Sequence, residues 1–316
     1  MPGKYGDIPP RIVNQDRQDS TAGFDITRQP KWDIPDKVVI KVAITGGVIK
    51  RARNPHQPCL LDEIREAALN CIEAGATCIH IHPRTTDGED VHVRDEFLQG
   101  LHHIIDPIKA RYGNSVLVDG CTLLSDFYDE VALIESGLVE ISPVNAFVMG
   151  NVSPRRRLQA ETMMMQDNGV KPEMSIRSDG DIDRVKAWLI DPGFVRKPYY
   201  WLLVPSFGLG GTAMPNVYAM AESTMWQVRQ IKEIDPESVI MVCMAGRPSI
   251  YLTAMAMMMG LHVRIGMEDT YVRWPHRDDI IESNIQVLMD TFDLARVLGR
   301  TPATANEYRA LIGLPT

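Results

Sequence analysis

The chain has 316 residues, with 33 basic and 41 acidic side chains and a formal net charge of −8 at neutral pH. Domains usually take about 100 to 200 residues, so this length fits one large barrel or two smaller domains. Hydrophobic residues make up 45% and charged residues 23%, which is ordinary for a folded protein and excludes disordered or collagen-like chains. The acidic balance argues against nucleic acid as a partner, because phosphate-binding surfaces are basic.

Cysteine content and hydropathy indicate the compartment. The five cysteines form no CxxC pair and lack the regular spacing of a disulfide framework, so we expect reduced thiols. The N-terminal region shows no secretory signal, and no apolar run approaches the roughly 18 residues that a membrane helix requires. The sequence therefore predicts a cytoplasmic protein without a membrane span.

The first 36 residues are rich in proline and polar side chains and have almost no periodic hydrophobicity. Such a segment cannot bury enough apolar surface to fold alone, so we predict an extended arm over residues 1–36. Its Phe24, Ile26 and Trp32 favour packing on the body or on a neighbouring subunit, although a frayed tail is also compatible.

From residue 37 to residue 316 the pattern predicts one catalytic domain in which strands and helices alternate. Short apolar or β-branched runs predict strands at 38–44, 77–82, 116–118, 138–141, 173–176, 200–204, 239–244 and 262–265. Helical apolar spacing predicts helices at 60–74, 97–112, 126–135, 155–166, 182–190, 217–234, 250–259 and 280–298.

Strict alternation implies parallel strands joined by right-handed crossovers, and eight such units make an α/β fold of the (β/α)₈ TIM-barrel type. The alternative is an open doubly wound sheet. The first turn, ITGGVIK, lacks the GxGxxG pattern of dinucleotide-binding sheets, and no GxxxxGK[ST] motif occurs. We therefore predict a TIM barrel with an N-terminal arm and a C-terminal helical extension.

The segment CIHIHPR ends the second predicted strand with His80 and His82. Strand alternation places both imidazoles on one side, and in a barrel the carboxyl ends of the strands form the active-site mouth. Two histidines at this place can hold one metal ion. The alternative is a hydrogen-bonded pair inside a polar layer.

The last predicted strand, in GLHVRIGMEDTY, carries Arg264 and is followed by Glu268 and Asp269. This strand neighbours the first one in a closed barrel, so Glu268 is expected across a small mouth from the histidines. Two His and one carboxylate make a Zn²⁺ or Fe²⁺ site with open positions for substrate. A buried Arg264 requires a carboxylate, for which Asp269 is nearest. Taken alone, Glu268 and Asp269 could instead be a solvated loop cap.

Cys121, near the end of the third predicted strand, could be a nucleophile. No feature of the sequence indicates a lowered pKa, so we expect a buried thiol.

The runs KVAITGG, EAGATCIHIHPRTTDG, KPEMS, GLHVRIGMEDTY, IIESNIQVL and LGRTPATANEYRALIGL occur in this order from Val38 to the C-terminus. In them the chain resembles the β-keto acid cleavage enzymes, of the 3-keto-5-aminohexanoate cleavage enzyme type. The resemblance implies a zinc-dependent (β/α)₈ barrel, often a homotetramer. It also implies an acyltransferase reaction in which a β-keto acid and acetyl-CoA give acetoacetate and a new acyl-CoA.

The resemblance also assigns roles to residues of the matching motifs. It implies that His80, His82 and Glu268 bind one Zn²⁺ per chain and that Asp269, paired with Arg264, abstracts a proton. Ser142 falls where the family shows a threonine hydroxyl, so the resemblance implies a catalytic hydroxyl at this position.

Three positions depart from the family in the expected substrate pocket. Val48 stands where a glutamate is frequent, Gly120 where a serine or threonine is frequent, and Ser175 replaces the second carboxylate of a P-E-x-E pattern, which leaves only Glu173. The departures remove partners for a cationic substrate. We therefore expect a β-keto acid with a neutral or anionic side chain instead of an amino-substituted one.

If the side chain of the substrate is anionic, Arg84 or Arg247 could bind it.

Two other functions remain open on the residues alone. One is a metal-dependent hydrolase of the lactonase or amidohydrolase type, which would need no CoA, and the other is a non-catalytic, metal-stabilised scaffold.

Overall fold

The computed structural model describes residues 30–91, 93–121, 127–146, 154–206 and 214–316. The chain divides into two compact units, Met1–Ile34 and Pro35–Thr316, and the second unit carries every element described below. Most of the expected N-terminal arm, including Phe24 and Ile26, lies outside the described residues. Over the described ranges, no helix has both the length and the apolar character needed to cross a membrane.

Eight parallel strands close into a barrel, which confirms the predicted TIM-barrel fold. Closure comes from the pairing of the first and last barrel strands, in which Ile40 lies beside Val263 and Val42 beside Ile265. An open doubly wound sheet is therefore excluded. The barrel strands are β2 Ile40–Thr45, β3 Cys78–Ile81, β4 Leu117–Gly120, β5 Ile141–Asn145, β6 Lys171–Ile176, β7 Tyr200–Leu203, β8 Val239–Cys243 and β9 His262–Ile265.

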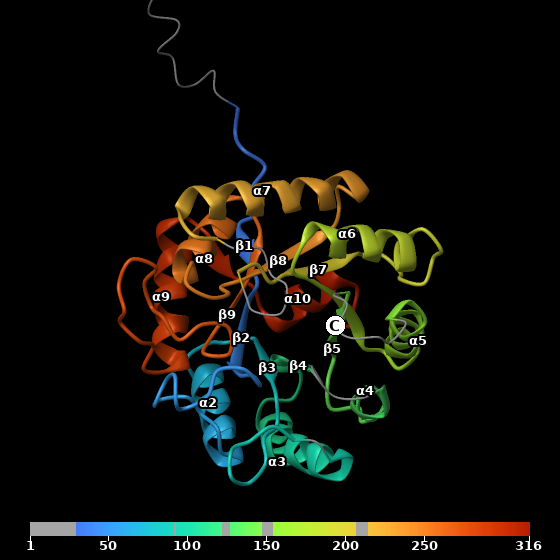
Figure 1. Ribbon diagram of the computed structural model, residues 1–316, viewed down its shortest axis with the longest axis vertical. Helices are drawn as coiled ribbons and strands as arrows, with labels where there is room; N and C mark the ends of the chain where they lie inside the picture. The colour runs from blue at the N-terminus through green and yellow to red at the C-terminus, as the bar shows by residue number, and fades with distance from the viewer. Residues whose placement is uncertain (1–29, 92, 122–126, 147–153, 207–213) are drawn as a thin grey trace, which may run out of the picture. The chain divides into compact units, whose positions relative to one another are not determined.

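Helices surround the barrel in chain order, as the ring of labels in Figure 1 shows. They are α2 Leu61–Glu73, α3 Arg94–Tyr112, α4 Phe127–Glu135, α5 Pro154–Asp167, α6 Asp179–Val185, α7 Val217–Ile234, α8 Ser249–Met258 and α9 Asn284–Val297. Two short helical segments, η2 Gly113–Ser115 and η3 Lys186–Ile190, follow α3 and α6. Apolar side chains on the outer face of the strands pack against this layer and form the larger core.

The expected C-terminal helical extension is α10 Ala305–Ile312, which lies at the centre of the ring in Figure 1. Its Tyr308 and Ile312 pack with Tyr200 in the core inside the barrel, and the hydroxyls of Tyr200 and Tyr308 are 2.5 Å apart. Arg309 binds the carbonyl oxygen of Asn114, before β4. The helix therefore closes the amino end of the barrel and leaves the carboxyl end for the site.

The short strands β1 Lys37–Val38 and β10 Thr301–Pro302 pair with each other outside the barrel.

Several predicted elements differ in their bounds by a few residues, and for two of them the reason is clear. The fourth barrel strand, β5, is Ile141–Asn145 instead of 138–141. The apolar residues Leu138 and Val139 are buried, but they precede the strand. The strand itself contains polar residues and is therefore less apparent in the sequence. The last long helix begins at Asn284 instead of residue 280, because the Ser283 side chain caps it by accepting a hydrogen bond from the backbone N–H of Gln286.

Candidate active site

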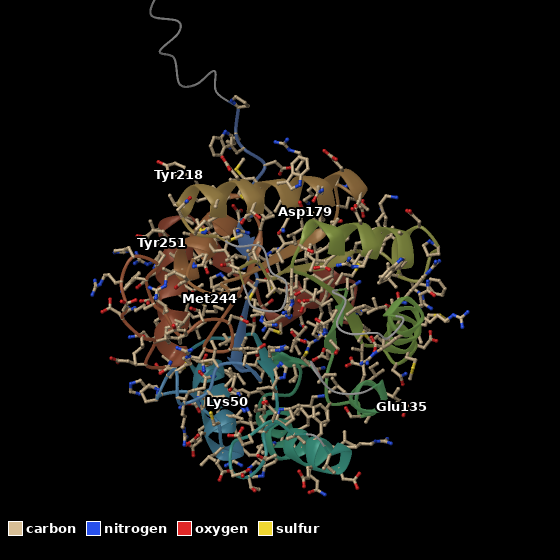
Figure 2. The ribbon with its side chains drawn as sticks, viewed as in Figure 1. Lys50, Glu135, Asp179, Tyr218, Met244 and Tyr251 are labelled. Carbon is tan, nitrogen blue, oxygen red and sulfur yellow. The ribbon has the colours of Figure 1, made fainter. Side chains whose placement is uncertain are left out.

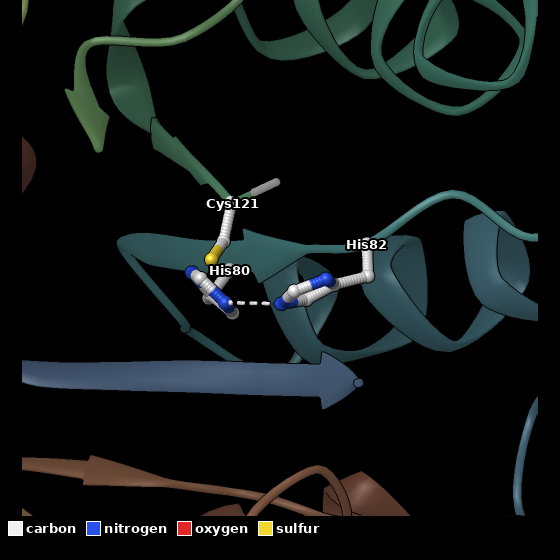
Figure 3. Close-up of side chains that lie close together, drawn as sticks. All are labelled: His80, His82 and Cys121. Atoms are coloured by element: carbon white, nitrogen blue, oxygen red, sulfur yellow. Dashed lines mark hydrogen bonds between the residues drawn. The ribbon is translucent and has the colours of Figure 1, made fainter. Parts of the chain in front are cut away.

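His80 and His82 lie at the carboxyl end of β3, and their Nε2 atoms are 3.0 Å apart. Figure 3 shows the two imidazoles beside the side chain of Cys121, which follows β4. The nitrogen and sulfur atoms of these three residues all lie within 4.8 Å of one another, so the group could hold a metal ion. None of the five cysteines forms a disulfide.

Glu268 reaches the same group from the turn after β9. Its Oε1 lies 3.3 Å from Nε2 of His80 and 3.5 Å from Nε2 of His82. Two glycines make this approach possible. A Cβ on Gly46 would lie 2.4 Å from Cγ of Glu268, and Gly266, at a φ of +132°, brings its Cα so close to β2 that a Cβ would lie 2.1 Å from the carbonyl oxygen of Ala43.

The spacing of the three ligand atoms fits a metal site. Nitrogen and oxygen ligands about 2.0 to 2.2 Å from a tetrahedral Zn²⁺ lie roughly 3.3 to 3.6 Å from each other. The distances of 3.0, 3.3 and 3.5 Å among His80, His82 and Glu268 are close to these values. The side chains are therefore arranged so that one ion between them would need little rearrangement.

A second layer of charged residues lies deeper in the barrel, below the histidines. Nδ1 of His80 lies 2.9 Å from Oδ2 of Asp119, and the same oxygen accepts a hydrogen bond from Lys41 at 2.5 Å. Lys41 also donates to Glu173 at 2.6 Å, and all four side chains are fully buried. Such a carboxylate behind a histidine fixes the orientation of the ring and leaves Nε2 for a metal.

The carboxylates control the protonation of the histidine. Burial alone would lower the pKa of His80, but the carboxylates of Glu268 and Asp119 outweigh it and raise the pKa to about 9. Burial would raise the pKa of Asp119, yet the charges of Lys41 and His80 lower it to about 2. A cation at the position between the histidines, either a proton or a metal ion, is therefore electrostatically favoured.

Arg264 and Asp269 form a buried pair beside this group. Nε and Nη2 of Arg264 donate to the two carboxylate oxygens of Asp269 at 3.0 and 2.8 Å, and Nη2 also donates to Glu268. Burial would lower the pKa of Arg264, but the two carboxylates hold it well above its ordinary value. The expected partner of Arg264 is thus in contact with it, and the guanidinium fixes both acidic side chains in place.

A cavity at this end of the barrel exposes these groups. Its lining among the described residues is Gly47, Val48, His80, His82, Cys121, Pro143, Asn145, Ser175, Arg177, Val204, Arg264, Glu268 and Asp269. Of the predicted substrate residues, Val48 and Ser175 belong to this lining.

Three predicted residues do not reach the cavity: strand alternation points two of them outward, and the third lies deeper inside the barrel. Ser142 faces outward from β5 and donates a hydrogen bond to Glu130 of α4 at 3.3 Å. A Cβ on Gly120 would point outward to Val139. Glu173 faces inward but lies in the deeper layer with Lys41. The inward positions at the ends of β4 and β5 are those of Cys121 and Asn145.

The two arginines predicted to meet an anionic substrate are also outside this lining. Arg84 is buried and pairs with Asp90 at 3.2 Å, and Arg247 pairs with Asp278 at 2.9 Å. The cavity instead contains Arg177, which sequence reasoning missed. Counting two residues on from Ser175 along β6 would have found it, because alternate residues of a strand share a face.

A closed (β/α)₈ barrel with a polar cavity and a buried Arg–Asp pair at the carboxyl ends of its strands has the architecture of an enzyme. Residues 37–314 match the family of β-keto acid cleavage enzymes, and the chain belongs to this family. The 3-keto-5-aminohexanoate cleavage enzyme of Fusobacterium nucleatum is 27% identical over 88% of this chain and 98% of its own length. The 3-oxoadipate:acetyl-CoA acetyltransferase of Cupriavidus necator is 25% identical over 88% of this chain and 95% of its own length.

Solved structures share the fold. A ternary complex of ObcA with a C4-CoA adduct and oxalate superposes with a TM-score of 0.65 at 18% identity, over 84% of this chain and 68% of that one. At this identity the likeness concerns the barrel alone.

Proposed function

We propose that the protein is a zinc-dependent acyltransferase that exchanges the acyl group of a β-keto acid with acetyl-CoA. The products are acetoacetate and a new acyl-CoA. The observation that carries this proposal is the arrangement of His80, His82 and Glu268 next to the Arg264–Asp269 pair, inside the region that matches the family.

His80, His82 and Glu268 would hold the Zn²⁺, and the distances of 3.0, 3.3 and 3.5 Å among their ligand atoms support this set. The ion would supply Lewis-acid stabilisation for the negative charge that develops on the keto oxygen of the substrate. Arg264 holds Glu268 and Asp269 in place and keeps their charges balanced in a buried site.

Asp269 is the proposed base. Each oxygen of a carboxylate has two lone pairs, so Asp269 can bind Arg264 and still accept the C2 proton of the β-keto acid. The resulting carbanion attacks the thioester carbonyl of acetyl-CoA and releases the CoA thiolate. The thiolate then attacks the original keto carbon, the C2–C3 bond breaks, and C2 recovers a proton from Asp269. This sequence gives acetoacetate and the new thioester, and requires no covalent bond to the protein.

Asp119 is proposed to position His80, with Lys41 holding Asp119 in turn. We expect Asp119→Asn to lower the affinity for Zn²⁺ by about 10- to 100-fold, because the amide holds the neutral imidazole less well. Competition with a chromogenic chelator measures this affinity. Asp106→Asn is the matched control, since Asp106 lies 3.1 Å from His102 on the exposed surface. Unchanged zinc affinity in Asp119→Asn would mean that the pair has no positioning role.

A cytoplasmic homotetramer is the proposed state. Its support within the described surface is a set of exposed apolar side chains on α7, namely Val217, Tyr218, Met225 and Trp226. Figure 2 shows Tyr218 at the periphery of the molecule. Exposed apolar surface of this kind favours association. Light scattering should give four times the 35.4 kDa mass of the chain, and a monomer mass at micromolar concentration would refute the assembly.

Turnover itself tests the function. A screen of β-keto acids should give acetoacetate only when acetyl-CoA is present, and a chelator should suppress the reaction. Activity that is indifferent to acetyl-CoA would instead favour a hydrolase.

A further inference from the structure

Strand β6 presents a line of polar side chains to the inside of the barrel. Glu173 pairs with Lys41 in the deeper layer, Ser175 lines the cavity, and Arg177 follows two residues later at the mouth. Residues two apart share a face of a strand, so the three side chains form one inward-facing row. Arg177 is only 4% exposed although it lines the cavity, so its charge lies within the site instead of on the outer surface.

The described cavity lining contains two arginines and two carboxylates. Glu268 and Asp269 are the acidic residues of this lining, and both accept hydrogen bonds from Arg264. Arg177 therefore adds a second guanidinium to a cavity whose carboxylates are already held by the first. Burial lowers the pKa of Arg177 and Arg264 acts in the same direction, whereas Cys121, Cys243 and Asp181 act against them. Because the net effect is a lowered pKa, an anion beside Arg177 would stabilise its charge.

The rest of the described lining offers no carboxylate to a cationic tail. Val48, where a carboxylate would hold an ammonium group, is an apolar side chain that is 48% exposed. Ser175 and Asn145 are neutral, and Cys121 is a thiol. An ammonium group would meet two guanidinium groups, whereas methylene groups followed by a carboxylate would match Val48 and Arg177.

We propose that Arg177 determines specificity by binding the distal carboxylate of a β-keto dicarboxylic acid. This inference rests on the proposed function and names its substrate class. A guanidinium binds a carboxylate through two parallel N–H···O bonds, which gives both affinity and orientation. The first carboxylate and the keto group would lie toward His80 and Glu268, and the second carboxylate would lie against Arg177.

A six-carbon substrate shows the balance of the reaction. 3-Oxoadipate and acetyl-CoA give acetoacetate and succinyl-CoA: the acetyl group joins C2, the C2–C3 bond breaks, and the four-carbon acyl group leaves on the CoA sulfur. No oxidant, reductant or water is consumed.

Three β-keto acids with the same six-carbon chain test the proposal: 3-oxoadipate with an anionic tail, 3-oxohexanoate with a neutral tail and 3-keto-5-aminohexanoate with a cationic tail. For the wild-type protein we expect kcat/KM to fall in this order. Arg177→Met should lower kcat/KM for 3-oxoadipate by about 100-fold, mainly through KM, and change that for 3-oxohexanoate by less than about threefold. Arg177→Lys should restore part of the preference, and Arg196→Met, at an exposed arginine, should have no effect.

Binding of adipate, which lacks the keto group, separates this inference from the proposed function. Calorimetry should show that adipate binds more tightly than hexanoate and that Arg177→Met removes the difference. Adipate binding that depends on Arg177, without turnover of any β-keto acid, would overturn the proposed function and leave the anion site standing. Turnover that prefers the cationic tail, or that Arg177→Met lowers equally for all three acids, would overturn the role of Arg177.

Discussion

Asp269→Asn is expected to lower kcat by about 10² to 10⁴ while the protein keeps its zinc. The amide cannot accept the C2 proton, but it has nearly the same size and can still bind Arg264. Asp269 lines the cavity while His80, His82 and Glu268 supply the proposed ligands, so the metal content should not change. Steady-state kinetics and elemental analysis on the same preparation measure both quantities.

Two further variants complete this test. Arg264→Ala should also lower kcat strongly, because Asp269 loses the two hydrogen bonds that orient it. Asp278→Asn is the control, since Asp278 is exposed and pairs with Arg247 away from the described cavity lining. Near wild-type turnover in Asp269→Asn would mean that another group is the base. Glu173 would be a poor replacement, because its fully buried carboxylate pairs with Lys41.

Loss of zinc on replacement of the ligands is the second large effect. The wild-type protein should contain about one Zn²⁺ per chain, and His80→Ala, His82→Ala and Glu268→Ala should each contain little, with turnover lost in parallel. Removing one of three protein ligands leaves too few donors for stable binding.

Cys121→Ala distinguishes between the two possible sets of ligands. The thiol lies in the group that could hold a metal, and the oxygen of Glu268 lies 3.3 and 3.5 Å from the Nε2 atoms of His80 and His82, as expected for ligands of one Zn²⁺. We therefore expect Cys121→Ala to keep its zinc. Zinc retained in Glu268→Ala and lost in Cys121→Ala would instead establish a His–His–Cys site.

The fold was predictable because it follows mainly from hydrophobic patterns within short stretches of the sequence. Alternating strand and helix patterns, together with parallel crossovers, leave few arrangements for eight units, and the barrel closed as expected. The prediction was wrong where the buried apolar residues do not coincide with the strand. Leu138 and Val139 are buried before β5 begins, so the strand was placed too early and the outward direction of Ser142 was not recognised.

The site was predictable only in part. The spacing of His80 and His82 and the position of Glu268 after the last strand indicated which side chains would meet, because barrel closure leaves only β2 between β3 and β9. The layer formed by Lys41, Asp119 and Glu173 depends on strand register, since these residues lie far apart in the sequence. No local motif records such a contact.

The fate of the acetyl group tests the central claim most directly. With acetyl-CoA labelled by ¹³C at its carbonyl carbon and an unlabelled β-keto acid, the account predicts acetoacetate labelled at its keto carbon, C3, and an unlabelled new acyl-CoA. NMR of the product mixture distinguishes the two carbonyl positions of acetoacetate. Unlabelled acetoacetate, or cleavage of the β-keto acid that proceeds without acetyl-CoA, would contradict the proposed exchange.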